Sequence, residues 1–450
     1  MTPLAILVVA LVIVIGGVLV FRLHPFVVLI VAAFVVAGLT PVEPAAATVG
    51  QRVAEGFGKT AVNVGIVIAM ASILGSCLTA AGGAQRLVTA IQGAVGTRRT
   101  PLALLLAGFV LGVPMYADTV FYLLVPLARA VWDRTGRGYL LGVLAIVGGA
   151  TMTHSLVPPT PGPLFVADTL GVDIATMIMV GLVVGSLAAL AGFGFARWAD
   201  HRWPLEPTAA LATSTPAAAE ASLASAPALW AAVLPILLPV VLISMESAAR
   251  STPELVPASL LPVVRLVGEK NMALSLAALS AVLLLAKTGG GLAAVRSTIV
   301  TAVTDAGSII LVIAAGGALG ASLRQSGLAE LSTAFGSGSG LVLIPIAWLV
   351  TVVIRLAQGS ATVAMITAAG VMAPVVLAGS LPFHPVYVAV AIGCGSKPGM
   401  WMNDSGFWVI SRMSGMTEGQ TLRSVSLMLV IEGVIGLLVT LGLAVLWPLV

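Results

Sequence analysis

Lys397 and Asp404 stand in a stretch that interrupts a strongly apolar part of the chain. The stretch is GCGSKPGMWMNDSGFW, residues 393–408, and it carries glycines and a proline between two apolar runs. Charge at membrane depth is costly, so each of these side chains is a candidate functional group. Two interpretations follow: Lys397 binds an anion directly, or Lys397 and Asp404 form an ion pair that braces the loop.

Five further ionisable residues lie within apolar segments. Asp118, in VPMYADTVFY, is a carboxyl group shielded from water, which suits reversible protonation; the alternative is a fixed partner for a buried cation. Arg355 precedes GSAT and either holds a substrate carboxylate or braces nearby carbonyl groups. His154 stands beside prolines and is either a hydrogen-bonded structural residue or part of a proton relay. Asp305 and Glu432 lie nearer the ends of apolar runs, where interfacial or inter-helix polar contacts are expected.

The composition places these residues in a membrane protein. Of 450 residues, 59% are hydrophobic and 8% are charged, whereas soluble domains carry about 25% charged residues. Apolar runs of roughly 20 residues, enough to cross the hydrocarbon as a helix, recur along the chain. The net charge of +4 indicates membrane topology rather than nucleic-acid binding. The first apolar run has no basic segment before it and is followed by Arg22, which favours a retained span over a signal peptide.

A low-complexity segment divides the chain into two related halves. PLEPTAALATSTPAAAEASLASAP, residues 204–227, has the Ala, Pro, Ser and Thr content of a flexible cytoplasmic linker. It separates a first repeat, residues 1–203, from a second, residues 228–450. LGSCLTAAG, YADTVFYLLVPLA and GPLFVADTLG in the first half correspond, in the same order, to LGASLRQSG, GSATVAMITAAGVMAP and GFWVISRMSG in the second. Internal duplication in a polytopic membrane protein is typical of transporter folds.

The distribution of Lys and Arg predicts how the halves are folded. Arg86, Arg98 and Arg99 precede residues 101–128, and three more arginines follow that segment. A re-entrant hairpin would place both clusters on the cytoplasmic face, as the positive-inside rule prefers, and the repeat predicts a second hairpin at 341–376. About five spans then remain in each half, and Arg52 falls in an outer loop. The expected spans are 4–21, 24–41, 59–81, 140–167 and 174–196, then 228–248, 271–287, 297–321, 383–410 and 424–448. Because the number of spans in each half is odd, the halves are expected to be inverted relative to each other, with the N-terminus outside.

Four predicted segments break the rules for helices at membrane depth: the two hairpins, THSLVPPTPGP at 153–163, and residues 393–408. Prolines and glycines there free backbone N–H and C=O groups that hydrocarbon cannot satisfy, so such backbone should line a cavity enclosed by protein. The N-terminus of a half-helix offers unpaired N–H groups and a positive dipole, which suit a carboxylate. The pattern therefore predicts a site for a small organic anion. The candidate binding residues are Thr153, His154, Thr160, Gly162, Arg355, Ser360, Thr362, Lys397, Asn403, Asp404 and Ser405, with Asp118 as the proton-coupling residue.

The chain resembles the gluconate permease (GntP) family of organic-anion:proton symporters, within the ion-transporter superfamily, at GGAQRL, THSLVPPTPGP, GSATVAMITAAGVMAP and NDSGFW. These motifs occur in family order and span nearly the whole chain. The resemblance implies an all-α polytopic membrane fold with two inverted repeats, re-entrant hairpins and interrupted helices. It also implies proton-coupled uptake of gluconate or a related hydroxy-carboxylate or sugar acid, without a cofactor, across a bacterial-type cytoplasmic (inner) membrane. The expected partners are the small organic anion and the lipid bilayer, and carriers of this kind often form homodimers.

Five positions depart from the family pattern. Glutamate is usual where Asp118 stands, histidine where Thr160 and Trp401 stand, proline where Ser405 stands, and an apolar residue where Lys397 stands. An added cation and two lost histidines imply a reshaped pocket that suits a shorter or differently charged acid.

Three alternatives to a proton-coupled symporter stay open. Na⁺ coupling would use Ser, Thr and Asn oxygens together with freed carbonyl groups, which GSAT and ND supply. A passive channel would equilibrate its substrate without accumulating it. An intramembrane enzyme would need a nucleophile–base set or a metal cluster. The four histidines and two cysteines have no zinc-ligand spacing, so neither a metal site nor a catalytic residue is expected.

Overall fold

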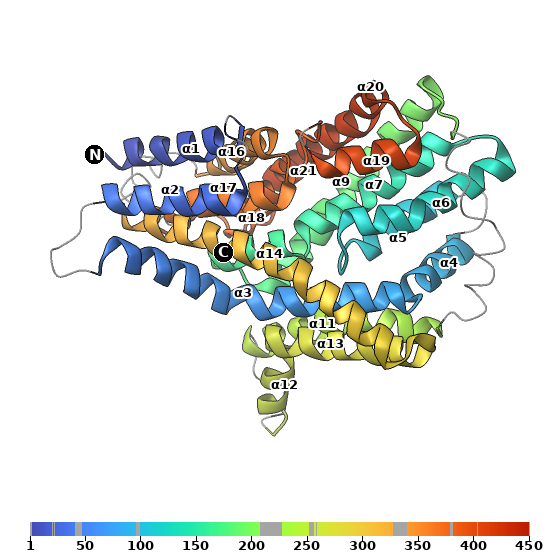
Figure 1. Cartoon of the computed structure of the whole chain (residues 1–450), viewed down its shortest axis with the longest axis horizontal. Coiled ribbons are helices and arrows are strands. Elements are labelled where there is room, and N and C mark those ends of the chain that lie inside the picture. Colours follow the sequence, from blue (N-terminus) through green and yellow to red (C-terminus); the bar gives the residue numbers. More distant parts are fainter. Residues whose placement is uncertain are drawn as a thin grey trace.

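The structure of the chain is a computed structural model, and every regular element among its described residues is a helix (Figure 1). The predicted all-α class is therefore confirmed. The predicted linker at 204–227 lies mostly outside the described residues. The structure describes residues 2–19, 21, 23–40, 47–95, 100–207, 227–251, 256–257, 259–326, 340–378, 381–402 and 404–449.

The described helices follow one another along the chain in two sets, before and after the linker. In the first half they are α1 (Pro3–Leu19), α2 (Pro25–Leu39), α3 (Val49–Ala80), α4 (Gly83–Val95), α5 (Thr100–Leu111), α6 (Ala117–Thr135), α7 (Tyr139–Leu156), α8 (Pro161–Thr169) and α9 (Ile174–Arg202). In the second half they are α11 (Leu229–Ser251), α12 (Leu261–Gly268), α13 (Lys270–Leu285), η4 (Ala286–Gly290), α14 (Gly291–Gln325), α16 (Leu343–Gln358), α17 (Ala361–Ala378), α18 (Val386–Gly395), α19 (Ser405–Ser414), α20 (Glu418–Thr421), η6 (Leu422–Ser426) and α21 (Leu427–Leu446).

Seven helical segments of the described chain are long and apolar enough to cross a membrane. The spans predicted at 24–41 and 383–410 correspond instead to shorter helices, α2 and the pair α18 and α19. The seven long segments are Val49–Ala80, Tyr139–Thr169, Ile174–Arg202, Leu229–Arg250, Lys270–Thr288, Gly291–Gln325 and Glu418–Leu446.

The longest helices, α3 and α14, pack along each other through small residues. A methyl group built at Gly56 of α3 would lie 2.8 Å from the Cβ of Ala321 in α14, so the glycine permits close approach of the backbones. A capping box between Thr48 and Gln51 starts α3 ten residues before the span expected at 59–81. Arg52, expected in an outer loop, is therefore a buried helical residue that donates to the carbonyl oxygen of Ala37 at 2.6 Å.

The helical structure is broken at the four places where the sequence predicts a hairpin or an interrupted helix. The breaks lie at 112–116 between α5 and α6, at 157–160 between α7 and α8, at 359–360 between α16 and α17, and at 396–404 between α18 and α19. Pro158 and Pro159 lack the N–H that would continue α7, and Pro161 starts α8 at a position where its missing N–H costs nothing. Gly359 ends α16 with φ of +73°, a left-handed conformation that suits glycine.

The related sequence motifs fall on corresponding elements of the two halves. LGSCLTAAG lies at the end of α3 and LGASLRQSG begins in the last turns of α14, whereas GPLFVADTLG covers most of α8 and GFWVISRMSG most of α19. α8 and α19 are each the second part of an interrupted helix. The inverted relation of the halves and the re-entrance of the hairpins stay predictions.

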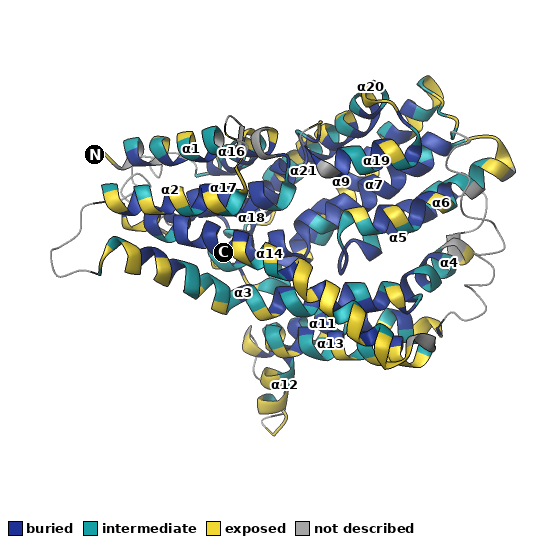
Figure 2. Ribbon diagram, viewed as in Figure 1, coloured by how far each residue is buried: buried dark blue, intermediate teal, exposed yellow. Residues whose placement is uncertain are grey.

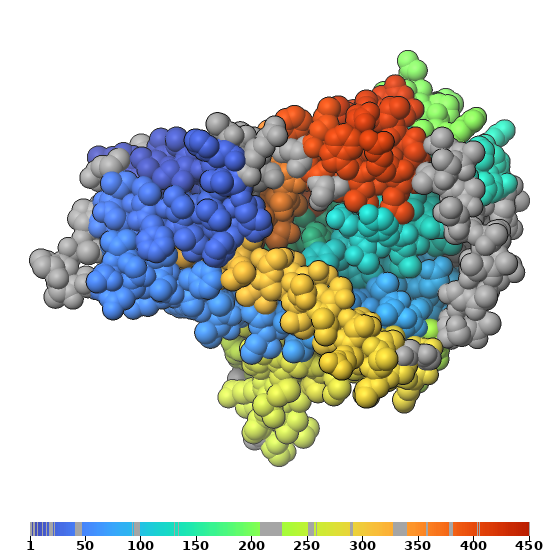
Figure 3. Space-filling model, viewed as in Figure 1, coloured from blue at the N-terminus to red at the C-terminus, as the bar shows by residue number. Residues whose placement is uncertain are grey.

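The α7–α8 segment is the most deeply buried of the long segments (Figure 2). Of its most apolar stretch of 18 residues, 89% lies inside the protein. Glycines bring α5 and α7 into backbone contact: a methyl group at Gly108 would lie 2.8 Å from the carbonyl oxygen of Ile146, and one at Gly149 would lie 2.8 Å from the backbone nitrogen of Phe109. The C-terminal half of α7 is thereby fixed at the centre of the molecule. On the face of the molecule seen in Figure 3, α6 and α19 lie beside each other.

Candidate functional site

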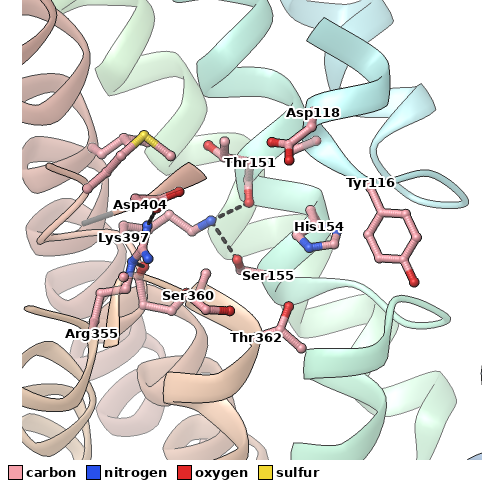
Figure 4. A pocket seen from close by; sticks show the side chains of 16 residues that line it. Tyr116, Asp118, Thr151, His154, Ser155, Arg355, Ser360, Thr362, Lys397 and Asp404 are labelled. Carbon is pink, nitrogen blue, oxygen red and sulfur yellow. Dashed lines mark hydrogen bonds and ion pairs between the residues drawn. The ribbon is translucent and has the colours of Figure 1, made fainter. Parts of the chain in front are cut away.

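Three of the helix breaks and the last turns of α7, just before the fourth break, meet around one cavity of about 190 Å³ (Figure 4). This volume corresponds to roughly six water molecules at their share of the liquid, which suits a small ligand. Each of the four interrupted segments contributes side chains, and α21 adds Leu429. The lining residues are Tyr116, Ala117, Asp118, Thr151, His154, Ser155, Arg355, Gly359, Ser360, Ala361, Thr362, Ser396, Lys397, Met400, Asp404 and Leu429.

Arg355 and Asp404 form a buried ion pair at one side of the cavity. The Arg355 side chain is 2% exposed and that of Asp404 is 9% exposed. The Arg355 Nε also donates to the carbonyl oxygen of Ser396 at 3.1 Å, and Asp404 caps α19 by accepting the N–H of Gly406 at 2.6 Å. Arg355 therefore braces the α18–α19 break. Its Nη1 is buried and has no hydrogen-bond partner.

Lys397 crosses the cavity wall toward α7 instead of pairing with Asp404. Its ammonium group donates to the backbone oxygen of Thr151 and, at 2.6 Å, to the Ser155 hydroxyl. Both acceptors are neutral, and the lysine is 3% exposed. The expected Lys397–Asp404 pair is therefore wrong, because Arg355 has taken the aspartate. Of the two cations that line the cavity, Lys397 is the one without a carboxylate partner among the described residues.

Asp118 lies in the first turn of α6 and lines the cavity. The residue is exposed, so the expectation that its carboxyl group is shielded from water is wrong. A methyl group built at Gly406 would lie 3.2 Å from Asp118 Oδ1 and 3.1 Å from Asp404 Oδ1. The two carboxylates therefore face each other across Gly406. Because Asp404 is already neutralised by Arg355, Asp118 is the acid that is free to respond to the contents of the cavity.

Two half-helices start at the cavity. α6 begins after Tyr116 without a side-chain cap, and α17 begins after Ser360, whose hydroxyl accepts the N–H of Val363 at only 3.4 Å. Thr362 adds a second hydroxyl from α17. The first N–H groups of a helix and its positive dipole suit an anion, and the hydroxyls can serve carboxylate or hydroxyl groups of a ligand.

His154 faces the cavity with its ring centroid 5.7 Å from that of Tyr116, at an interplanar angle of 59°. Within the described parts of the chain, its buried Nδ1 has no hydrogen-bond partner, and the same holds for the Thr151 hydroxyl. Buried polar atoms are ordinarily hydrogen-bonded, so these atoms are available to a ligand or to water. Within the described part of the chain, no group of three or more His, Cys, Asp or Glu residues is placed to hold a metal ion.

Some predicted site residues lie away from the cavity. Thr153 points about 200° around α7 from both Thr151 and Ser155, and its hydroxyl donates to its own helix. Thr160 is the N-cap residue of α8 and donates to the Val157 carbonyl at 2.8 Å. Gly162 packs against Met365. Asn403 and the Ser405 side chain lie outside the described part of the structure.

The structure adds residues that sequence reasoning missed. Thr151 and Ser155 lie one helical turn apart on the same face of α7, a spacing that marks a polar stripe on an apolar helix. Glu432, expected near the end of a span, is instead fully buried within the helical segment 418–446. Asp305 lies in the interior of α14 and is exposed.

Comparison with known proteins identifies the chain. The family model of the GntP family permeases matches residues 2–446. The chain belongs to the GntP permease family. It is accordingly a multi-pass transporter of the inner membrane and not an enzyme.

Relatives of this permease cover nearly its full length. It is 33% identical to an uncharacterized permease of Haemophilus influenzae over 88% of this chain and 83% of that protein. A gluconate permease of Pseudomonas aeruginosa is 31% identical over 94% of this chain and 93% of the relative. The D-serine transporter DsdX of Escherichia coli K12 is 28% identical over 93% and 92%. The crystal structure of the YdaH transporter of Alcanivorax borkumensis has a similar fold, with a TM-score of 0.64 at 16% identity, covering 95% of this chain and 100% of that one.

Proposed function

We propose that this permease takes up a small hydroxy-carboxylate, with gluconate as the reference substrate, together with a proton. The observation that carries the proposal is the convergence of four interrupted helical segments on one cavity that contains Lys397, a cation without a carboxylate partner among the described residues. A substrate carboxylate is the natural partner for that ammonium group, because a buried charge is otherwise costly. Relatives named as gluconate permeases support the choice of substrate.

The remaining polar groups would orient the substrate. Arg355 Nη1, His154 Nδ1 and the Thr151 hydroxyl are buried atoms without partners, and each belongs to a residue that lines the cavity. Ser360 and Thr362 at the start of α17 would bind substrate hydroxyl groups. A ligand that carries several oxygens could satisfy these groups at once.

Asp118 is the proposed proton-coupling residue. It faces Asp404 across Gly406, and two neighbouring carboxylates disfavour the ionised form of the one that lacks a cation. A proton on Asp118 would remove this repulsion when the anionic substrate enters. Conformational cycling would then carry substrate and proton together, with the two halves of the chain as inverted repeats and α5–α6 and α16–α17 as re-entrant hairpins.

Two variants of this function have support of their own. Asp118 opposite Lys397 also fits a zwitterion, whose ammonium group would approach the aspartate, and one relative is a D-serine transporter. Na⁺ in place of the proton would use Asp118 with carbonyl and hydroxyl oxygens of the breaks, which suit a hard cation.

Uptake into proteoliposomes tests the proposal and its variants together. Gluconate, glycerate, lactate and D-serine would each be offered with an inward proton gradient, an inward Na⁺ gradient, and neither. Accumulation of a hydroxy-carboxylate with protons alone is the expected result. Accumulation with Na⁺ alone would replace the proton by sodium, and equilibration without accumulation under all conditions would overturn coupled transport.

A further inference from the structure

Glu432 is a fully buried carboxyl group whose two oxygens have no hydrogen-bond partner among the described residues. It lies in α21 and occupies a space that two glycines leave open. A methyl group at Gly148 of α7 would lie 2.5 Å from Glu432 Oε1, and one at Gly192 of α9 would lie 2.8 Å from its carboxyl carbon. Any larger residue at either glycine would displace the carboxyl group. The fold therefore makes room for Glu432 without giving it a fixed partner.

Glu432 and Lys397 approach the same face of α7 from neighbouring elements. Lys397 donates to Thr151 and Ser155, whereas Glu432 lies against Gly148. Residues 148, 151 and 155 are spaced at i, i+3 and i+7, so they form one stripe of the helix. Gly148 and Thr151 are about 4.5 Å apart along the helix axis. The ammonium group, held between Thr151 and Ser155, therefore lies about one to two helical turns along this stripe from the carboxyl group.

Packing between α21 and α18 also brings Glu432 and Lys397 into the same region. The residue after Glu432, Gly433, is so close to the end of α18 that a methyl group there would lie 2.6 Å from Pro398, the neighbour of Lys397. One turn further along α21, a methyl group at Gly436 would lie 2.5 Å from the sulfur of Cys394. The segment that carries Lys397 therefore rests directly on α21.

Other ionisable groups around Glu432 are neutral, already paired or distant. On α18, Cys394 is a buried thiol; on α7, His154 faces the cavity and Tyr116; on α16, Arg355 is held by Asp404. The charged residues of α9 begin at Arg197, more than a turn beyond Gly192, and those of the helix that contains Glu432 lie at its start, at Glu418 and Arg423. Lys397 is therefore the cation that responds to Glu432.

We propose that Glu432 is a second proton-binding site, which releases its proton when the cavity is empty and takes up a proton when an anion binds Lys397. With the cavity empty, a deprotonated Glu432 balances the Lys397 ammonium group. A substrate carboxylate at Lys397 puts two anions beside one cation, and repulsion then favours a neutral Glu432. The proton comes from water in the cavity, and the unpartnered hydroxyl of Thr151, which lines the cavity on the same stripe of α7, offers a route.

The inference rests on the proposed anion site at Lys397. It adds a proton-binding site at Glu432 to the one proposed at Asp118. It predicts that the affinity of the purified full-length protein for gluconate or D-serine falls as pH rises, by up to tenfold per pH unit for one linked proton. Glu432→Gln, which keeps the shape of the side chain but cannot titrate, should reduce that dependence. Glu418→Gln, an exposed acid at the start of the same helical segment, is the matched control and should keep the wild-type dependence. An unchanged pH dependence in Glu432→Gln would overturn the proposal.

A second experiment, thermal unfolding of variants, needs no substrate. The thermal unfolding midpoint in detergent would be compared for the wild-type protein, Lys397→Met, Glu432→Gln and the double variant. If Glu432 balances Lys397, the double variant should lose less than the sum of the two single losses; additive losses would overturn the pairing, whether or not a probe binds.

The two proposals can fail separately. If wild-type uptake ignores the proton gradient, the proposed function fails, while the thermal arm still decides whether Glu432 and Lys397 are coupled. If Asp118→Asn abolishes the pH dependence of binding and Glu432→Gln leaves it intact, proton coupling at Asp118 stands and the second site falls.

Discussion

Arg355 and Asp404 join the end of α16 to the start of α19 through a buried ion pair, although they come from different interrupted segments. The same arginine donates to the Ser396 carbonyl, and the same aspartate caps α19. The pair therefore holds the α18–α19 break beside the α16–α17 break. Its charges cancel, which leaves Lys397 as the cation of the cavity that can attract an anion.

Removing one partner of this pair should destabilise the protein strongly. Arg355→Met leaves the Asp404 carboxylate buried without its cation, which is expected to cost about 3–5 kcal/mol. The matched control is Arg265→Met, at an exposed position of α12; a surface substitution of this kind should change stability by no more than about 0.5 kcal/mol. Thermal unfolding in detergent measures both. Equal, small losses in the two variants would show that the buried pair does not brace the break.

Lys397 should matter for binding more than for folding. Its acceptors are neutral, so Lys397→Met removes a charge from the cavity without leaving a carboxylate in direct contact unpaired. We expect gluconate affinity to fall by about 10- to 100-fold, the range of a charge-assisted hydrogen bond of about 1.5–3 kcal/mol. Titration calorimetry on purified protein checks this, with the exposed Lys287→Met as control. Unchanged affinity with a lowered unfolding midpoint would assign Lys397 a purely structural role.

Asp118→Asn should separate accumulation from exchange. Without the Asp118 carboxyl group, the empty carrier can no longer return with this site deprotonated, so accumulation driven by the Asp118 proton should be lost. Exchange of internal for external substrate does not need that step and should persist. Asp133→Asn, at the exposed far end of the same helix α6, should leave both processes intact. Accumulation that survives in Asp118→Asn would move the coupling site elsewhere.

The sequence predicts the four helix breaks because proline and glycine act on the backbone at their own positions. It also brings Arg355, Lys397 and Asp118 into consideration, because ionisable residues are rare in apolar runs. The pairing of these side chains does not follow from the sequence. Asp404 lies nearer to Lys397 along the chain, yet it pairs with Arg355, since α16 packs against α18.

Helix phase and close packing explain the remaining differences. Thr153 belongs to a polar motif, but it faces away from Thr151 and Ser155 on α7, so its place in a motif does not put it in the cavity. Glu432 is buried because Gly148 and Gly192, far away in the sequence, leave room for it. Such long-range packing has no local sequence signal.

The predicted re-entrance of α5 and α6 can be tested by labelling single cysteines with a membrane-impermeant reagent. The native Cys77 and Cys394 are both buried, so they should react slowly. Gly93→Cys in α4 and Arg137→Cys after α6 introduce thiols at exposed positions before and after the pair. If α5 and α6 form a hairpin, both thiols should react only from the cytoplasmic side, because the basic clusters belong there.

Gly50→Cys serves as the control for sidedness. Gly50 is exposed at the start of α3, and α3 is long enough to cross the membrane once before α4. Its thiol should therefore react only from outside. Reaction of Gly93→Cys and Arg137→Cys from opposite sides would mean that α5 and α6 together cross the membrane. In that case each half would contain an even number of crossings, and the inverted relation of the two halves would have to be abandoned.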